Sequence, residues 1–490
     1  MLLTRSLPRF AGLFAAFVVI CNVGCAVPLA PGYSILKESR EVHFVSGRPS
    51  HLEIAVRYTL ENTGTSALEF IDAILPDEKS FGRGNVRVEM NGHAITPEKL
   101  TEELSWGPQE VFRLKLDSWA QKQRRDLLIA YDFASFQDSG ARITLGGSDF
   151  HLGSRGWSPE LEPPKRILAP FPHRPVRTLV TIRVPSNFVV LSRGTGVGRK
   201  QSGSEAEYRF QLRKGDLDPY IVAGRYAESA SSRQSGAVVF WTHEPLKDNL
   251  SSVAPGVGAA WEVLQRNFGA LDKNIRNVHL VEASNLRAPA NGEDDPATAA
   301  FPGGVLFSSD ALGSGATNDS FVEGVTRALA RNWFGEEMRV AGNAAVGMGE
   351  GLPEYAAIVI DEARNGESAR RARVIQLLHD YDDARKQAEE KPLASSFLSD
   401  SPEQRRIALA KAPLFYVALE DSYGEAPIRQ GLRDLVELLK GQEAGYDDLR
   451  AALEHTTGKS MEDIFRVWLR EKGIPEDFRA KYQEGRQSLP

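Results

Sequence analysis

Three charged residues in one predicted helix, and a carboxylate that follows that helix, have the most definite spacing in this chain. Glu323, Arg327 and Arg331 stand at i, i+4 and i+8, which places them along one helix face. Glu350 follows Arg331 after eighteen intervening residues and lies between two glycines. Because a carboxylate buried without a cation is costly, we predict that Glu350 pairs with Arg327 or Arg331. Such a pair would hold two helices together by charge.

The first of these helices is predicted from its ends and from its apolar face. Ser320 and Glu323 form an S-x-x-E capping box at its start, and Gly335 is expected to end it. Its predicted core face consists of Val322, Val325, Leu329 and Trp333. The second helix is predicted from Leu352-Pro353 to about Arg364, because proline is favoured in a first turn and Asn365-Gly366 follows.

Each charged residue also has a simpler interpretation. Arg327 and Arg331 suit the solvated face of an amphipathic helix. Glu323 suits the acid of the capping box, with a secondary role in pairing with Arg327 one turn later. Glu350 would favour the following helix through the helix dipole. These interpretations predict exposed side chains, whereas the ion-pair hypothesis predicts buried or half-buried ones.

The segment Val325–Gly335, V-T-R-A-L-A-R-N-W-F-G, resembles the V-x-H-E-x-x-H-x-W-F-G helix of the gluzincin metallopeptidases of the aminopeptidase N family. Gly349-Glu350-Gly351 resembles the N-E-G motif that supplies the third zinc ligand of that family, at the family's spacing. The resemblance puts Arg327 and Arg331 at the two histidine ligands and Ala328 at the general base. Arginine stays protonated and has no lone pair for a metal, and alanine cannot accept a proton. We therefore predict no catalytic residues and no metal, with zinc expected only under the alternative of an active peptidase.

Two further family positions are also changed. The run Ala410–Leu419 resembles the family's Y-x-K-G and the apolar helix after it, which puts Leu409 at the tyrosine that stabilises the oxyanion. The run Thr298–Val305 matches the family's G-A-M-E-N loop, which puts Ala300 at the glutamate that binds the substrate amine. Trp468-Leu469 and Gly473-Ile474-Pro475 resemble the family's W-L-x-x-x-G-x-P ending.

The pattern of apolar residues predicts an α+β multidomain protein. Residues 38–232 read as an antiparallel β domain, with alternation from Leu52 to Leu60 and a hairpin turn at Asn91-Gly92. Residues 233–490 read as mostly helical, and the resemblance implies a thermolysin-like, peptidase-type domain there. The charged run Arg370–Glu390 within it is predicted to be a solvated helix. Both domains resemble those of the aminopeptidase N family in their order.

The N-terminus has the features of an export signal. Arg5 and Arg9 precede an apolar run that is too short to cross a bilayer, and Asn22-Val23-Gly24-Cys25 resembles a lipoprotein box. We predict a lipoprotein-type signal over 1–25, lipid on Cys25, a tether over 26–37, and an exported protein anchored to a membrane of the cell envelope. The alternative is plain secretion after a small residue near Ala26. The cysteines are confined to positions 21 and 25, so the folded body contains no disulfide.

Composition limits the possible partners. The chain has 490 residues, 42% of them apolar and 25% charged, with a net charge of −6. Acids and bases are interspersed, which favours neither nucleic-acid binding nor a polybasic membrane patch. No H-x-x-x-H or H-x-H spacing occurs among the nine histidines.

Two functions from different classes remain. The first is a non-catalytic exported protein that binds a peptide or an envelope protein in the groove of a former peptidase. The second is a zinc-dependent or rearranged-site hydrolase, in which Glu350 and Glu354 would act as paired carboxylates.

Overall fold

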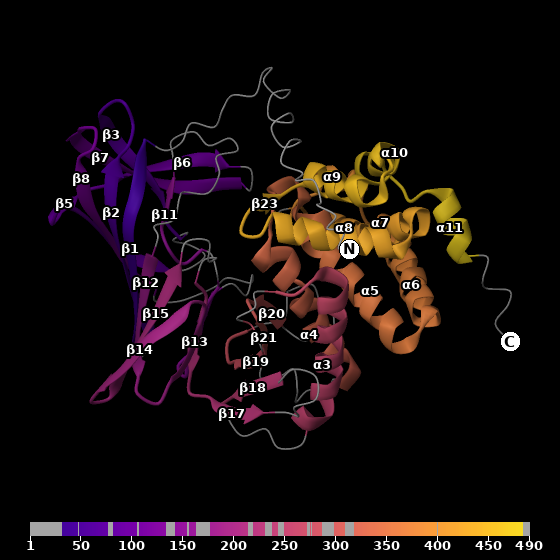
Figure 1. Cartoon of the computed structure of the whole chain (residues 1–490), viewed down its shortest axis with the longest axis horizontal. Coiled ribbons are helices and arrows are strands. Elements are labelled where there is room, and N and C mark those ends of the chain that lie inside the picture. Colours follow the sequence, from indigo (N-terminus) through magenta and orange to yellow (C-terminus); the bar gives the residue numbers. More distant parts are fainter. Residues whose placement is uncertain are drawn as a thin grey trace, which may run out of the picture.

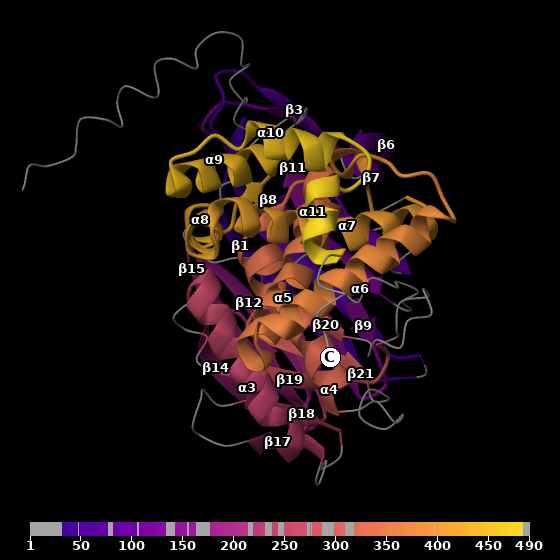
Figure 2. The ribbon, with the colours of Figure 1, turned by 90° about the vertical axis from the view of Figure 1, so that its right-hand side faces the viewer.

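The chain folds into a β-rich N-terminal domain and a mostly helical C-terminal domain, as predicted (Figure 1). The computed structural model describes residues 32–47, 49–76, 82–104, 107–133, 143–153, 156–162, 177–213, 219–230, 238–243, 249–271, 275, 277–286, 298–308, 318–398 and 400–483. The predicted signal segment 1–25, with Cys25, lies outside these residues. In Figure 2 the helices stand in front of the strands of the N-terminal domain.

The N-terminal domain is built on an eight-stranded sheet. Its strands, in spatial order, are β14 (Thr195–Ser202), β15 (Glu205–Arg213), β12 (Arg177–Pro185), β1 (Tyr33–Val45), β2 (His51–Asn62), β8 (Arg124–Phe133), β4 (Arg83–Met90) and β5 (His93–Ile95). Among these described strands, pairing is antiparallel except between β1 and β12, which run parallel. Strand β1 begins at Tyr33, so residues 33–37 belong to the sheet rather than to a tether.

Two four-stranded sheets complete this domain. One contains β13 (Val189–Ser192), β16 (Ile221–Gly224), β10 (Asp149–Leu152) and β9 (Ile143–Leu145), and the other contains β11 (Glu160–Glu162), β3 (Leu68–Ile74), β7 (Gly107–Trp119) and β6 (Glu98–Leu104). The alternation in β2 buries Leu52, Ile54, Val56, Tyr58 and Leu60 in the core between the sheets. The hairpin turn lies at Asn91-Gly92, where both residues have positive φ, as the sequence predicted.

A five-stranded sheet begins the second domain and lies between the first domain and the helices (Figure 1). Its order is β17 (Ala227–Ala230), β18 (Val238–Thr242), β19 (Val278–Ala283), β21 (Gly304–Ser308) and β20 (Thr298–Phe301). Because β17 pairs with β18, the change of domain comes before residue 227 rather than at the predicted boundary between 232 and 233. Strand β20 pairs with β21 on one side and forms an edge of this sheet.

The described helices of the second domain are α3 (Asn249–Phe268), α4 (Asn318–Ala330), α5 (Gly351–Asn365), α6 (Glu367–Arg385), α7 (Pro402–Tyr423), α8 (Glu425–Leu438), α9 (Tyr446–Thr457), α10 (Glu462–Phe465) and α11 (Glu476–Gln483). A two-stranded sheet joins β22 (Arg339–Val340) to β23 (Glu443–Ala444). None of the described helices combines the length and apolar character that a membrane span requires.

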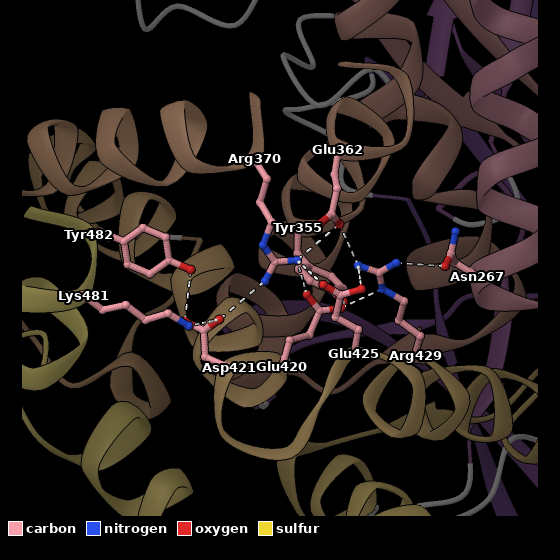
Figure 3. A network of polar contacts seen from close by, with 10 residues as sticks. All are labelled: Asn267, Tyr355, Glu362, Arg370, Glu420, Asp421, Glu425, Arg429, Lys481 and Tyr482. Atoms are coloured by element: carbon pink, nitrogen blue, oxygen red, sulfur yellow. Dashed lines mark hydrogen bonds and ion pairs between the residues drawn. The ribbon is translucent and has the colours of Figure 1, made fainter. Parts of the chain in front are cut away.

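Helix α6 corrects the prediction of a solvated helix over Arg370–Glu390. The guanidinium of Arg370 is buried and donates to the buried carboxylate of Glu420 in α7 at 2.5 Å (Figure 3). At the other end, Tyr381 donates to Glu390 at 2.6 Å, and Glu390 forms a buried ion pair with Lys411 at 3.0 Å. The prediction was wrong because the charges of α6 meet opposite charges on other elements, which composition alone does not show.

The two domains share an interface with apolar and polar parts. Tyr220 and Val222 of the first domain pack in one cluster with Val281 and Leu306 of the second. The buried carboxylate of Asp149, in β10, accepts hydrogen bonds from both the backbone N–H, at 2.9 Å, and the hydroxyl of Ser284, which follows β19. These contacts fix the five-stranded sheet, and with it the edge strand β20, against the first domain.

Candidate functional site

Arg327 of α4 and Arg331, which directly follows α4, face Glu354 in the first turn of α5 and Glu350, which directly precedes α5. Arg331 Nη2 lies 2.6 Å from Glu350 Oε2, and Arg327 Nη1 lies 3.6 Å from Glu354 Oε2. The structure therefore brings together Arg327, Arg331 and Glu350, and of the two arginines it places Arg331 on Glu350. The side chains of Arg327 and Glu354 are 16% and 17% exposed, whereas those of Arg331 and Glu350 are 37% and 30% exposed. All four are at least half-buried, and the inner pair is better shielded from water.

Arg373 of α6 adds a third guanidinium that the sequence did not suggest. It donates a hydrogen bond to Glu354 and lies 3.6 Å from Glu323, which is also 3.8 Å from Arg327. Burial alone would raise the pKa of Glu354, but Arg373, Arg327 and Arg331 together hold this pKa below its ordinary value. Glu354 is therefore ionised and shared between guanidiniums from α4 and α6.

The start of α4 differs from the prediction. The helix already includes Asn318 and Asp319, so Ser320 lies inside its first turns and is not its N-cap. Glu323 is therefore not the acid of a capping box, and its carboxylate lies near Arg327 and Arg373 instead. Asn318 and Asp319 also suit a helix N-terminus, which is why the S-x-x-E pattern placed the start too late.

The end of α4 agrees with the prediction in part. The regular α-helix stops at Ala330, earlier than predicted, and a π-helical segment follows over Asn332–Glu337. Within this segment the backbone leaves helical geometry at Phe334 and Gly335, so a helix break does occur at Gly335. Here Trp333 donates to the carbonyl of Gly269 at 2.8 Å and packs against Trp261 of α3. A second π-helical segment, Ala345–Glu350, leads into α5. One irregular helical segment thus follows Arg331 directly, and the other ends at Glu350, so both residues of this ion pair lie where regular α-helix gives way to irregular turns.

Asn332 fixes the β20–β21 hairpin against the site. Its side-chain oxygen accepts from the N–H of Gly303 at 2.7 Å, and its amide donates to the carbonyl of Gly304 at 3.4 Å. Asn332 is fully buried, so these two bonds determine the position of the turn between the strands. Thr298 adds a 3.5 Å bond to the carbonyl of Gly324 in α4. Strand β20 is thereby held alongside α4.

The other predicted positions lie outside the ion-paired cluster. Ala300 is half-buried in the edge strand β20, and Leu409 is exposed on α7. Ala328 is fully buried in the core face of α4 and has no polar group to offer. None of the three supplies a proton acceptor or an oxyanion donor.

The donors at this site do not fit zinc. The two positions on α4 carry guanidiniums, which have no lone pair, and the carboxylate of Glu350 is occupied by Arg331. Within the part of the chain that the structure describes, no group of three or more His, Cys, Asp or Glu side chains could hold a metal ion. The carboxylates of Glu350 and Glu354 each face arginine rather than forming an acid pair with one another.

Solved structures of similar overall fold identify the fold of this chain. The M1 zinc metallopeptidase of Deinococcus radiodurans matches with a TM-score of 0.63 and 16% identity, over 91% of this chain and 95% of the other. Legionella pneumophila aminopeptidase A, in complex with aspartic acid, matches with a TM-score of 0.64 and 15% identity, over 91% of this chain and 50% of the other. This chain has the aminopeptidase N-like gluzincin fold.

A third solved structure extends the likeness. Yeast LTA4 hydrolase in complex with bestatin matches with a TM-score of 0.65 and 13% identity, over 91% of this chain and 68% of the other. No family model and no curated protein matches the sequence. At such identities the gluzincin likeness establishes the fold, and function has to be argued from the side chains of the site.

Two residues of the site were missed by sequence reasoning. Arg373 gave no signal, because its partners Glu323 and Glu354 are distant in sequence and the helix that carries it is rich in charge throughout. Asn332 did carry a weak signal, since a polar residue between the apolar face of α4 and Trp333-Phe334 suggests a buried amide with a specific partner.

The different shielding of the two ion pairs predicts which one stabilises the fold. Glu354→Gln should lower the free energy of unfolding by about 1–3 kcal/mol, because it leaves shielded guanidiniums without their anion. Glu350→Gln should cost at most about 1 kcal/mol, because its partner Arg331 is more exposed and screened by solvent. Thermal unfolding of both variants beside the parent chain measures the difference. Equal losses would contradict this ranking.

The pH dependence of the same variants supplies an internal check. The pKa of Glu354 is lower in the folded chain than its ordinary value, so its contribution to stability is present above the unfolded-state pKa. That contribution is lost as the pH falls through the folded-state pKa. The gap in melting temperature between Glu354→Gln and the parent chain should therefore be full at neutral pH and close in acid.

Proposed function

We propose that this protein is a non-catalytic member of the aminopeptidase N fold that binds a peptide or a protein in its groove. The observation that carries the proposal is the 2.6 Å contact between Arg331 and Glu350. In zinc peptidases the corresponding carboxylate serves as a metal ligand, whereas here a guanidinium neutralises it. With Ala328 at the position of the family's general base, these side chains would offer neither ligands for a Lewis-acid metal nor a base for activating water.

The edge strand β20 supports binding of an extended polypeptide. A sheet edge offers backbone N–H and C=O groups that pair with an added strand, which gives affinity without requiring chemistry. The bonds of Asn332 and Thr298 hold this edge beside α4. Ala300 has no charged side chain, so a bound polypeptide would not need a free amino end at that position.

The rearranged-site hydrolase is less well supported. A general base works best with a pKa near the working pH, and the guanidiniums around Glu354 move its pKa in the opposite direction. Glu350 is engaged by Arg331. Neither carboxylate is therefore poised to take a proton from water.

Zinc content tests the loss of the metal site. After exposure to excess zinc and removal of loose metal, the parent chain should retain essentially none. The double variant Arg327→His/Arg331→His recreates two imidazoles beside Glu350 and should retain about one zinc per chain. Arg57→His/Arg87→His, at exposed positions of the first domain, is the matched control. About one zinc on the parent chain would overturn the proposal and favour the peptidase alternative.

Cysteine labelling tests the groove. The chain from Ala26 onward has no cysteine, so Ala300→Cys introduces a unique thiol on β20. A saturating pool of synthetic extended peptides should slow its alkylation several-fold by covering the strand. The control thiol Val197→Cys, on the exposed β14, should react at an unchanged rate. Equal protection of both thiols, or of neither, would argue against peptide binding at this edge.

We also propose that the protein is exported and held at a membrane by lipid on Cys25. The proposal rests on the apolar N-terminal run and the lipoprotein-like motif. Mass spectrometry of the mature N-terminus should find an acylated Cys25, and Cys25→Ser should move the protein from the membrane fraction to the soluble fraction. An unmodified N-terminus near Ala26 would instead support plain secretion.

A further inference from the structure

The pairing of an arginine with a glutamate across α4 and α5 does not continue to the turn before Arg327, where Glu323 lies. Arg331, just after α4, pairs with Glu350, just before α5, and Arg327 of α4 pairs with Glu354 of α5. One turn before Arg327, Glu323 of α4 shares a pocket with Asp361 of α5, so acid stands near acid. The pocket has a volume of about 260 Å³. Its lining consists of Glu323, Thr326, Ala357, Ile360, Asp361, Arg364 and Asn365.

Asp361 lacks a partner in this pocket. Within the described ranges of the chain, no hydrogen bond or ion pair joins the half-buried Asp361 to another residue, Arg364 included. Burial, and after it the carboxylate of Glu323, raises the pKa of Asp361, while Arg373 and Arg364 oppose this effect. The nearest cations to Glu323, on Arg373 and Arg327, stand off at 3.6 and 3.8 Å. Neither contact is a close hydrogen bond, so the carboxylate of Glu323 keeps lone pairs for a further donor.

Thr326 supplies a second, independent polar group. It lines the same pocket and is 3% exposed, and its hydroxyl finds no hydrogen-bond partner among the described residues. Buried hydroxyls are normally satisfied, so an unpartnered one beside a cavity points to an absent partner. Two carboxylates and a hydroxyl together accept the three N–H groups of an ammonium ion.

The pocket suits an organic cation better than a metal ion. It has only two carboxylates, and Arg364 on its wall repels a divalent cation about twice as strongly as a monovalent ammonium at the same distance. Its volume is slightly below the range of about 300–1,000 Å³ for small-molecule sites, which suits one side chain or a small amine. Ala357 and Ile360 offer apolar walls for a carbon chain that leads to the charge.

We propose that the pocket between α4 and α5 binds a primary ammonium group between Glu323 and Asp361, with its carbon chain against Ala357 and Ile360. The ammonium would supply the close hydrogen-bond donor that the carboxylates of Glu323 and Asp361 do not receive from the arginines around them. A free alkylamine and a lysine side chain of a polypeptide carry this same group. The proposal does not depend on peptide binding at β20, because the pocket is built from α4 and α5 alone.

Titration with a matched pair of ligands tests the site. Calorimetry on the purified chain should detect binding of Nα-acetyl-lysine amide, whereas Nα-acetyl-norleucine amide, similar in shape but uncharged, should bind at least about tenfold more weakly. Asp361→Asn and Glu323→Gln should each weaken the lysine analogue by about tenfold or more. Asp463→Asn, at a fully exposed carboxylate of α10, should change nothing.

Further measurements distinguish a free amine from a polypeptide lysine as the natural ligand and control for misfolded variants. Butylammonium that binds as tightly as the lysine analogue indicates a free amine as the natural ligand, and weaker binding indicates a polypeptide lysine; both support the site. Thr326→Val keeps the shape of the side chain and should weaken binding by removing the hydroxyl. Equal affinity for the norleucine analogue, or unchanged affinity in Asp361→Asn with an unchanged melting temperature, would overturn the proposal.

Discussion

The arrangement of the second domain depends on one buried carboxylate, that of Glu420 in α7. Its side chain is fully buried and accepts hydrogen bonds from Arg370 of α6 at 2.5 Å, Arg429 of α8 at 2.7 Å and Tyr355 of α5 at 2.5 Å (Figure 3). Glu362 of α5 accepts from the same two arginines, which closes the network. A buried charge is tolerated only when such pairing is complete, so four helices have to take fixed relative positions. Because Tyr355 follows Glu354 directly, this constraint also fixes where α5 presents its charges to α4.

Arg327 and Arg331 join α4 to the start of α5 through ion pairs with Glu354 and Glu350. A metal bound to ligands from two helices joins them through one centre, whereas guanidiniums join them through separate pairs with different exposure. The pair at Glu350 is the more open one, and the shielded contacts converge on Glu354. The family motif drew attention to Glu350. The better-shielded ion pairs, which should stabilise the fold more, are instead made by Glu354, one turn later in the chain.

What the sequence predicted well was periodic and local. The alternation of β2, the turn at Asn91-Gly92 and the limits of α5 follow from side-chain geometry within a few residues. The resemblance to aminopeptidases supplied the fold, which the alternating pattern alone did not. The predictions that failed concerned residues whose partners are distant in sequence. The charged composition of α6 predicted a solvated helix, although Arg370 and Tyr381 are buried. For the same reason the sequence did not indicate that Arg373 belongs to the site. The start of α4 failed for another reason, since several adjacent residues suit a helix N-terminus equally well.

The contacts that hold the site in shape come from residues other than Arg327, Ala328 and Arg331. Trp333 is fixed by Gly269 and Trp261, and Asn332 by the hairpin turn at Gly303. None of these contacts involves the positions of the two arginines. Substitution at Arg327 or Arg331 is therefore constrained mainly by the carboxylates of Glu350 and Glu354, which need cations, whereas substitution at the buried Ala328 is constrained by core packing. Guanidiniums meet that need here, and the bonds from Asn332 and Thr298 hold β20 beside α4 independently of these ion pairs.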